Sequence, residues 1–288
     1  MNIQKDVPLA PHTTFKTGGT AEYFCEVSTK EELVECIDWS KKEKIKKFCL
    51  GGGSNILVND TGYKGLVIKI KNSDIFWEEN FSVSGAGIPL AQIITEAKAR
   101  GLGGMEWAFG IPATLGGAVR NNAGAYGQNM AEQVVEVEIF DLKKERFVSL
   151  KKDDCRFSYH RSIFHEKPDW IIWEIKLEWM LTDKKIIQDK INDYLARRKE
   201  KQPLEYPSAG SFFRNPDEKT PAGLLIEKAG LKGKGIGGAR VSKKHANFII
   251  NTGNATTEDI AILASIIKQK VRTKFGVQLH EEVEYVGF

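Results

Sequence analysis

The stretch LGGGSNILV, residues 50–58, places three consecutive glycines before Ser54 and Asn55 and then returns to an apolar run. Each glycine costs roughly 0.5–1 kcal/mol relative to alanine in regular structure, so such a run occurs where φ is positive or where another group approaches the backbone. Consecutive N–H groups in a glycine turn form an anion-binding concavity, and both polar side chains can add hydrogen bonds to it. The stretch indicates an anion site, with a plain turn between strands as the alternative.

A second glycine-rich segment, GLGGMEWAFGIPATLGGAVRNNAGAYG, occupies residues 101–127. Long glycine-rich connections without regular structure are uncommon in compact domains and usually have a binding role. Two bare-backbone surfaces can enclose one extended ligand, with a diphosphate on one and a flat ring on the other. The two segments together therefore favour a nucleotide-like ligand over a simple turn.

Two other phosphate-binding patterns are excluded. The sequence has no GxxxxGK[ST] loop, which argues against an NTPase. Its GxGxxG match, GKGIGG at 233–238, follows a predicted helix and precedes a predicted strand. A dinucleotide-binding fold requires the opposite order, so we interpret this match as accidental.

The composition is that of a soluble globular protein. The chain has 288 residues, 41% hydrophobic and 28% charged, which is enough for two or three domains. A net charge of only +4, with acidic residues interleaved, argues against a nucleic-acid partner. The four cysteines have no CxxC or zinc-type spacing, so we expect free thiols and no metal site. Without an apolar leader or a span of 18 apolar residues, we expect a cytoplasmic protein that does not bind membranes, and the absence of long heptads favours a monomer.

The hydrophobic pattern predicts alternating helices and strands. A capping box at Thr29 and Glu32 begins the first predicted helix. Thr220 is the expected cap of a short helix with Pro221 at its first position. A charged amphipathic helix at 183–203 is the expected domain boundary. The predicted helices are 28–43, 88–100, 183–203, 221–229 and 257–275, and the predicted strands include 65–70, 81–87, 134–141, 169–179, 239–242, 246–251 and the C-terminal EVEYVG.

Five stretches resemble the UDP-N-acetylenolpyruvoylglucosamine reductases, flavoenzymes of bacterial cell-wall synthesis. They are GGGSNILV, GIPATLGGAVRNNAGAYG, YPSAGSFFRNP, KHANFIIN and LHEEVEYVG, and the likeness extends from Thr14 to Phe288. The segment between Trp179 and Gln202 is too short for an extra substrate-capping loop, so the chain is similar to the shorter form of the family. The resemblance implies an α+β protein with a vanillyl-alcohol-oxidase-like (PCMH-type) FAD fold. Its two lobes would be residues 1–64 and 65–182, followed by a C-terminal α+β substrate domain at 183–288.

The resemblance also implies the cofactors. FAD would be the bound cofactor and NADPH the reducing cosubstrate. The residues expected to hold the FAD diphosphate and the rest of the cofactor are Gly51, Gly52, Gly53, Ser54, Asn55, Ile56, Gly110, Ile111, Pro112, Thr114, Gly117, Ala123 and Gly124.

The implied reaction reduces a UDP-N-acetylglucosamine enolpyruvate to UDP-N-acetylmuramate. NADPH reduces the flavin, hydride then passes to C3 of the enolpyruvyl group, and C2 is protonated. Ser211 in AGSFF matches the family's proton donor, and Glu282 in HEEVEY matches its carboxylate partner. Read from the residues alone, Ser211 is a turn residue after Gly210 and Glu282 is a solvated carboxylate.

One position departs from the family pattern. The family has Tyr-Arg-x-Ser, with the arginine on the substrate carboxylate, whereas this chain has YHRS at 159–162. If this segment is an extended strand, a shift of one residue turns a side chain to the opposite face. Either His160 acts as the cation, or a bulge re-aims Arg161. We prefer Arg161, because a guanidinium is always charged and binds a carboxylate through two hydrogen bonds.

The resemblance places four further residues near the UDP-sugar. Arg198, Lys201 and Asn215 match positions close to the nucleotide, and His245 matches another probable substrate contact. Two other functions remain open from the residues: an FAD-dependent alcohol or sugar oxidase of the same fold, and a non-catalytic nucleotide-binding module. Some such oxidases tether flavin through histidine or cysteine, and Cys49 lies just before the glycine turn.

Overall fold

The computed structural model describes residues 2–217 and 219–288 and divides into two compact units. Unit 1 contains Phe24–Gly52 and Leu66–Ala196 with the first few residues, and unit 2 contains Gln4–Tyr23, Gly53–Gly65 and Arg197–Phe288. The division therefore falls between Gly52 and Gly53, and also inside one helix and two strands. Each unit is built from segments that are distant in sequence. The predicted domain limits stay a prediction.

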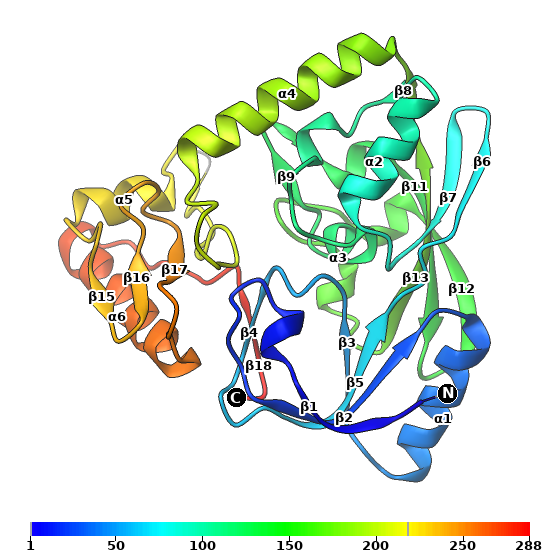
Figure 1. Ribbon diagram of the computed structural model, residues 1–288, viewed down its shortest axis with the longest axis horizontal. Coiled ribbons are helices and arrows are strands. Elements are labelled where there is room, and N and C mark those ends of the chain that lie inside the picture. The colour runs from blue at the N-terminus through cyan, green and yellow to red at the C-terminus, as the bar shows by residue number, and fades with distance from the viewer. Residues whose placement is uncertain (1, 218) are drawn as a thin grey trace. The chain divides into compact units, whose positions relative to one another are not determined.

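Unit 1 is organised around an antiparallel sheet of five strands in the order β12-β11-β13-β7-β6 (Figure 1). Its central strands β11 and β13 pair along most of their length, with Val137 opposite Ile175, and both of these side chains are fully buried. Helix α3 (Leu115–Arg120) contacts β13, and α2 (Leu90–Ala99) precedes it in the chain. The strands are β6 (Ile75–Glu78), β7 (Phe81–Gly85), β11 (Val134–Asp141), β12 (Arg146–Lys151) and β13 (Trp170–Glu178).

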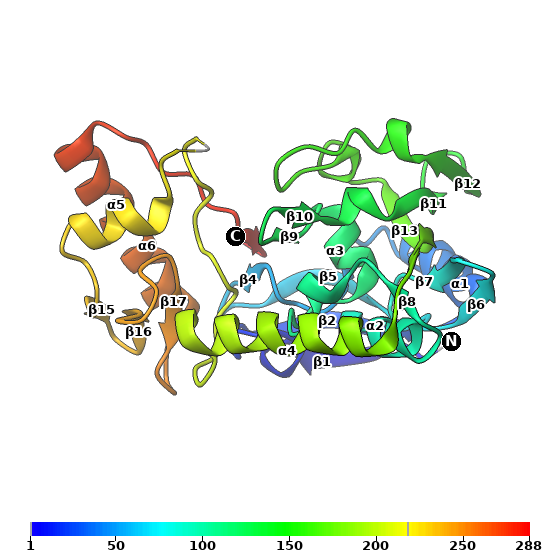
Figure 2. The ribbon, with the colours of Figure 1, turned by 90° about the horizontal axis from the view of Figure 1, so that it is seen from above.

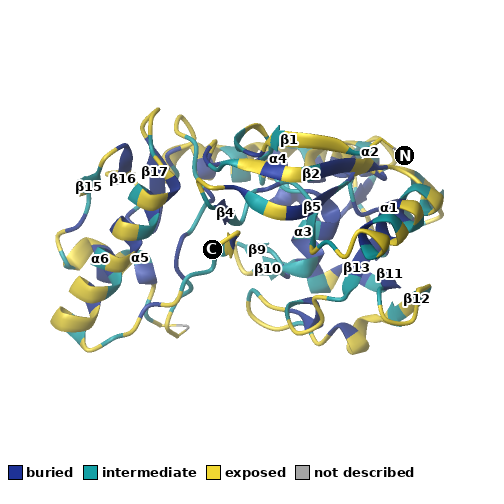
Figure 3. Cartoon of the chain, turned by 90° about the horizontal axis from the view of Figure 1, so that it is seen from below, coloured by how far each residue is buried: buried dark blue, intermediate teal, exposed yellow. Residues whose placement is uncertain are grey.

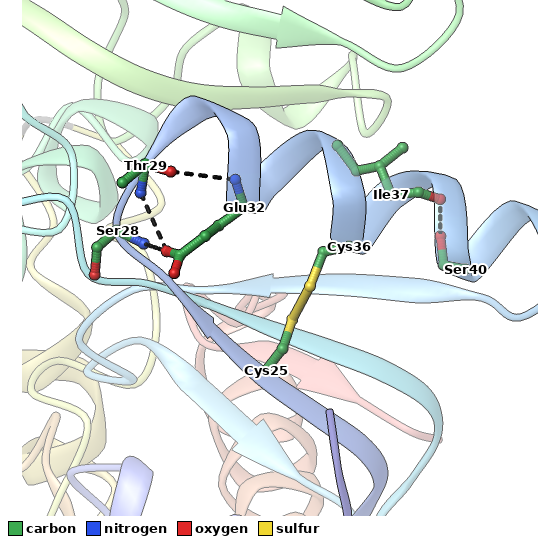
Figure 4. Close-up of a disulfide and its surroundings, with 7 residues drawn as sticks. All are labelled: Cys25, Ser28, Thr29, Glu32, Cys36, Ile37 and Ser40. Atoms are coloured by element: carbon green, nitrogen blue, oxygen red, sulfur yellow. Dashed lines mark hydrogen bonds between the residues drawn. A yellow bond between two sulfur atoms is a disulfide. The ribbon is translucent and has the colours of Figure 1, made fainter. Parts of the chain in front are cut away.

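The first helix of unit 1, α1 (Lys30–Lys42), confirms its prediction. Thr29 accepts a hydrogen bond from the Glu32 backbone and the Glu32 carboxylate accepts from the Thr29 N–H, which is the expected capping box (Figure 4). The expectation of free thiols holds for Cys49 and Cys155 but is wrong for the other two cysteines. The structure joins Cys25 and Cys36 as a disulfide, with a Cα–Cα distance of 7.5 Å (Figure 4).

Strand β3 (Lys47–Leu50) leads directly into the first glycine turn. It pairs in parallel with β5 (Tyr63–Ile70), with Cys49 opposite Ile68. The remaining strands and the long helix are β1 (Gln4–Pro8), β2 (Thr20–Val27), β8 (Leu102–Gly103), β9 (Gly124–Ala125), β10 (Gln128–Asn129), β14 (Met180–Leu181) and α4 (Lys184–Lys201), with 3-10 turns at Ala10–His12, Glu106–Ala108, Met130–Glu132, Lys152–Cys155 and Ile163–His165. The predicted helix at 183–203 is thus confirmed as α4, and it follows β14 without an inserted loop. The part of the chain that the structure describes contains no helix long and apolar enough to cross a membrane.

Unit 2 places two helices beside a three-stranded sheet in the order β15-β16-β17 (Figure 1). Strand β17 is buried along its whole length, whereas α6 has an exposed face (Figure 3). The stripe predicted on α6 is confirmed, because Ile260, Leu263, Ile267 and Val271 are all fully buried. Besides β1 and the 3-10 turn at Ala10–His12, unit 2 contains β4 (Ile56–Val58), α5 (Ala222–Lys228), β15 (Gly235–Ile236), β16 (Ala239–Val241), β17 (Ile249–Asn251), α6 (Thr257–Phe275) and β18 (Glu284–Val286).

Three local expectations are corrected or refined by the structure. Thr220 does not cap α5: the N-cap is Pro221, and the Asn215 side-chain oxygen accepts the Ala222 N–H at 3.0 Å. The glycine-rich segment 101–127 is not wholly irregular, because it contains α3 and β9, which pairs with β10 just after the segment (Figure 2). The GKGIGG match forms β15 and the turn into β16, as expected of an accidental match.

Candidate cofactor and active site

The two glycine-rich segments meet inside unit 1. A Cβ atom added to Gly51 would lie 2.7 Å from the Thr114 hydroxyl oxygen, and one added to Gly52 would lie 3.0 Å from the Pro112 carbonyl oxygen. Real Cβ atoms essentially never lie as close to another heavy atom as the first distance, and the second distance is shorter than most real Cβ contacts. The missing side chains therefore let the end of β3 lie directly against the loop before α3. Lys69 of β5 donates to the Gly51 carbonyl at 2.6 Å and so ties the turn to β5.

A cavity of about 210 Å³ opens beside this junction, entirely within unit 1. Its walls are mostly apolar, and two cationic residues, Lys47 and Arg120, also line it. The Thr114 side chain lines it as well: Thr114 is 8% exposed, and its hydroxyl is among the buried polar atoms that have no hydrogen-bond partner in the described structure. The other lining residues include Phe48, Leu50, Ile70, Ala86, Gly116, Gly117, Leu142, Phe164, Pro168, Trp170, Ile171 and Ile172.

These features fit a flavin dinucleotide. A flat ring needs apolar walls, and a diphosphate needs exposed backbone N–H groups, hydroxyl donors and positive charge. The cavity combines a bare backbone at Gly51, Gly116 and Gly117 with an unsatisfied buried hydroxyl and two cations. An unmade hydrogen bond on a buried hydroxyl costs roughly 1–3 kcal/mol, which a bound phosphate or ribose oxygen would recover.

Cys49 also lines this cavity, which bears on a covalent flavin link. Burial raises the pKa of its thiol to about 12, although Arg120 and Lys47 act in the opposite direction. The group is therefore a neutral thiol at physiological pH, and the thiolate is the nucleophilic form of cysteine. This environment does not favour a thioether tether at Cys49.

The rest of the first glycine stretch lies in unit 2 and joins the C-terminal segment. Gly53 has a φ of +66°, and a Cβ there would collide with the His12 carbonyl oxygen, so glycine is required. The Asn55 side chain donates to the Glu282 carbonyl at 3.1 Å, and the Asn55 carbonyl accepts the Glu284 N–H at 3.0 Å. Ile56 then begins β4, which pairs in parallel with β18.

The same region of unit 2 carries both residues proposed to move the proton. The Glu282 N–H donates to the Phe212 carbonyl at 2.9 Å, and the backbones of Phe213 and Glu281 form an isolated antiparallel β-bridge. Ser211 therefore lies one residue from the backbone hydrogen bond that holds Glu282. The structure brings Ser211, Glu282 and Asn55 together in unit 2, although they are distant in sequence.

The YHRS segment is not an extended strand, which corrects the premise used for it. Residues 158–161 form a tight turn in which the Ser158 N–H donates to the Arg161 carbonyl at 2.9 Å and the Arg161 N–H donates back at 3.1 Å. His160 is at a corner of this turn, with a φ of +49°. No bulge is needed to orient Arg161, because a turn does not impose the alternating faces of a strand.

The expected substrate residues all lie in unit 2. Arg198 is only 6% exposed near the end of α4, where the Lys244 amine donates to the Lys199 carbonyl at 2.7 Å. Lys201 is the last residue of α4 and is exposed. Asn215 uses its side-chain oxygen on the first turn of α5.

His245 is half-buried against Phe248, and this burial and Lys232 together lower the pKa of its imidazole. Its Nδ1 accepts the Asn247 N–H at 3.2 Å, so the neutral ring carries its proton on Nε2. At neutral pH the group is therefore a hydrogen-bond donor and not a cation.

Comparison with known proteins agrees with this arrangement. An FAD binding domain model matches residues 21–150, and a model of the UDP-N-acetylenolpyruvoylglucosamine reductase C-terminal domain matches residues 202–286. UDP-N-acetylenolpyruvoylglucosamine reductase from Caldanaerobacter subterraneus subsp. tengcongensis is 43% identical over 97% of this chain and 92% of its own length. The protein of the same name from Synechococcus sp. (strain JA-3-3Ab) is 42% identical over 99% and 91%.

The chain belongs to the UDP-N-acetylenolpyruvoylglucosamine reductase family. A crystal structure of UDP-N-acetylenolpyruvylglucosamine reductase from Thermus caldophilus matches it with a TM-score of 0.85 and 32% identity, covering 99% of both chains. The expected family, the α+β fold with an FAD-binding domain, and the assignment as an FAD-dependent oxidoreductase are confirmed. The individual residue roles stay predictions.

The structure also shows four cationic residues at the candidate site that the sequence analysis did not predict. Lys47 and Arg120 line the cavity, Lys69 binds the Gly51 carbonyl, and Lys244 binds the end of α4. Arg120 lies within a quoted family stretch, so its charge was visible. Its direction toward the cavity depends on the position of α3 against β13, which the sequence pattern does not reveal.

Proposed function

We propose that this chain uses NADPH to reduce the enolpyruvyl group of UDP-N-acetylglucosamine enolpyruvate, giving UDP-N-acetylmuramate for peptidoglycan synthesis. The observation that carries the proposal is the joint in unit 2, where Asn55 and Phe212 both hydrogen-bond the backbone of Glu282. These two hydrogen bonds support the proposal, because Asn55 belongs to the first glycine stretch and Phe212 directly follows Ser211 in the chain. The family relationship is consistent with it.

The cofactor role is assigned to the cavity and the glycine turns. FAD, when bound, supplies the chemistry that accepts hydride from NADPH and delivers it to C3 of the enolpyruvyl group. Gly51, Gly52 and Thr114 would hold the diphosphate, with Lys47 and Arg120 as the nearby positive charges. The remaining predicted residues, in the order of the chain, are Gly53, Ser54, Asn55, Ile56, Gly110, Ile111, Pro112, Gly117, Ala123 and Gly124.

Ser211 would donate the proton to C2. Hydride addition at C3 places negative charge on C2 and on the adjacent carboxylate, so hydrogen-bonding and cationic groups must lie where that charge develops. The Ser211 hydroxyl can give up its proton there, with the Glu282 carboxylate as its partner in the site. Arg161, with His160 as the alternative, would bind the enolpyruvyl carboxylate through a charge-assisted hydrogen bond.

The UDP moiety would be held by Arg198, Lys201, Asn215 and His245. The two cations would neutralise the diphosphate, and His245 would donate a neutral hydrogen bond from Nε2. The proposal further takes the protein to be a cytoplasmic monomer acting on a small molecule without nucleic acid. Size-exclusion chromatography with light scattering tests the monomer, and a second, larger species as the main peak would contradict it.

The test is NADPH oxidation by the FAD-loaded protein with and without UDP-N-acetylglucosamine enolpyruvate. We expect consumption that depends on the substrate. Ser211→Ala should still be reduced by NADPH but should lose turnover by on the order of 10²–10⁴-fold, as expected for removal of a general acid. If NADPH is consumed equally without substrate, and an alcohol or sugar reduces the flavin instead, the oxidase alternative holds.

The two candidate carboxylate ligands are separated by single substitutions. We expect Arg161→Ala to lose turnover, and His160→Ala to retain most of it. If Arg161→Ala keeps its turnover while His160→Ala loses it, the assignment of Arg161 is wrong. Both substitutions are read in the same NADPH assay with the flavin content measured first.

A further inference from the structure

The turn at residues 158–161 is held by the segment that ends α3. Asn122 is 5% exposed, and its side-chain nitrogen donates to the Ser158 carbonyl at 2.9 Å. Its side-chain oxygen accepts the Ala131 N–H at 3.0 Å. One side chain thus ties the turn that carries His160 and Arg161 to the glycine-rich segment.

Two neighbouring residues bind the chain just after the turn. The Ser162 hydroxyl donates to the Arg120 carbonyl, and the His165 ring contacts the Asn121 side-chain oxygen at 3.1 Å. Residues 120, 121 and 122 therefore each hold residues 158–165 through a separate hydrogen bond. Arg120 also lines the cavity, so the segment that holds the turn borders the proposed cofactor site at this residue.

The geometry of Asn122 leaves it little freedom. Its backbone has a φ of +39°, a conformation that Asn, Asp and Gly adopt more readily than other residues. Both ends of its side-chain amide are used, one as donor and one as acceptor. Rotation about its side-chain bonds would break both hydrogen bonds, so the position of the Ser158 carbonyl is fixed relative to α3.

We propose that Asn122 is a positioning residue for the reduction: it fixes the 158–161 turn so that the cationic side chain on it meets the enolpyruvyl carboxylate. This inference rests on the proposed function. Asn122 acts through the turn and does not itself touch substrate. It should affect the step that uses the substrate and spare flavin binding and flavin reduction.

The test compares Asn122→Asp with Asn80→Asp. Aspartate keeps the shape, the positive φ and the acceptor for Ala131, but it removes the donor to Ser158 and puts an oxygen against the Ser158 carbonyl. Asn80 makes the same kind of bond, from its side-chain nitrogen to the Trp179 carbonyl at 3.3 Å, in the β6-β7 hairpin. It is therefore a matched control for loss of an amide-to-carbonyl bond in unit 1.

Three properties are measured for each variant: the FAD dissociation constant of the apoprotein, the rate of flavin reduction by NADPH, and the rate of reoxidation of the reduced flavin by the enolpyruvyl substrate. For Asn122→Asp we expect reoxidation to slow by on the order of 10–100-fold, as small misplacements of a binding group do. The other two values should stay within about twofold, and hydrogen exchange of residues 156–165 should be faster in the apoprotein. Asn80→Asp should match the wild type in all of these.

Two results would overturn the inference. One is reoxidation by Asn122→Asp at the wild-type rate. The other is a loss of FAD affinity with unchanged rates in the loaded enzyme, which would assign Asn122 to the cofactor segment. Should Asn122→Asp not fold, Ser162→Ala removes an independent anchor of the same region and must show the same split. If the enolpyruvyl substrate does not reoxidise the reduced flavin of the wild-type protein, the proposed function is contradicted instead.

Discussion

Thr114 lines the cavity that we assign to the cofactor. Its buried hydroxyl has no hydrogen-bond partner in the structure as described, a state that costs roughly 1–3 kcal/mol. We expect Thr114→Val, which keeps the shape, to raise the free energy of unfolding of the apoprotein by about 1 kcal/mol. The same substitution should weaken FAD binding, because it removes a ligand hydrogen bond. Urea denaturation and a flavin titration measure the two effects.

The prediction is specific because Thr114→Val should raise the stability of the apoprotein but lower its affinity for FAD. A residue that only packs would lower stability and affinity together, and Thr114→Ser, which keeps the hydroxyl, should retain most of the FAD affinity. A Thr114→Val variant that binds FAD as the wild type does would contradict the role of this hydroxyl.

Glu174 gives a residue-scale prediction for pH. Burial raises the pKa of its carboxyl, Lys30 of α1 opposes this shift, and Glu138 on the neighbouring strand β11 adds to it. A raised pKa means that folding favours the protonated form, so the contribution to stability is complete below the unfolded pKa and is lost as pH rises through the folded pKa. We expect Glu174→Gln to be more stable than the wild type at neutral pH, with the difference shrinking toward pH 4.5.

Chemical denaturation across pH measures this difference. Lys30 keeps its ion pair with Glu138 at 2.7 Å in the variant, so the main interaction of α1 with this sheet is retained. Glu178→Gln, at an exposed position of the same strand, is the control. A stability difference for Glu174→Gln that grows as pH falls would show that the sign is wrong.

At the scale of elements, α6 is fixed by a carboxylate from a distant loop. Asp60 accepts the Thr257 N–H at 3.0 Å and the Glu258 N–H at 3.1 Å. These N–H groups belong to the first turn of the helix and have no acceptor within the helix itself. Loss of a capping side chain costs roughly 0.5–2 kcal/mol. We expect Asp60→Ala to lower the free energy of unfolding by an amount in this range, measured by urea denaturation. Asp60→Asn should lose less, and an unchanged Asp60→Ala would contradict the capping role.

The same scale shows what the sequence could predict. The capping box of α1 and the apolar stripe of α6 are local patterns, so both were predictable. The turn at 158–161 was not predicted, because it is closed by hydrogen bonds between Ser158 and Arg161 and is tied to Asn122, which lies 36 residues earlier. Asn215 replaced Thr220 at the start of α5 for a related reason: a cap can come from outside the adjacent residues.

At the scale of the whole molecule, the units do not follow the order of the sequence. The first glycine stretch contributes Gly51 and Gly52 to unit 1 and Gly53 to Asn55 to unit 2. Hydrophobic patterning locates elements along the chain, but it does not indicate which distant elements share a unit. The pairing of β4 with β18 and the joint at Glu282 therefore needed the structure. The chemistry of Ser211 and Glu282 came from the family resemblance and not from the spacing of the residues.

The central claim is that this chain passes electrons from reduced flavin to an enolpyruvyl UDP-sugar. The most direct measurement is anaerobic: the FAD-loaded protein is reduced, and UDP-N-acetylglucosamine enolpyruvate is added while the flavin absorbance is followed. We predict that an equimolar amount of substrate restores the oxidised flavin spectrum and yields UDP-N-acetylmuramate. A flavin that stays reduced in the presence of excess substrate would contradict the account.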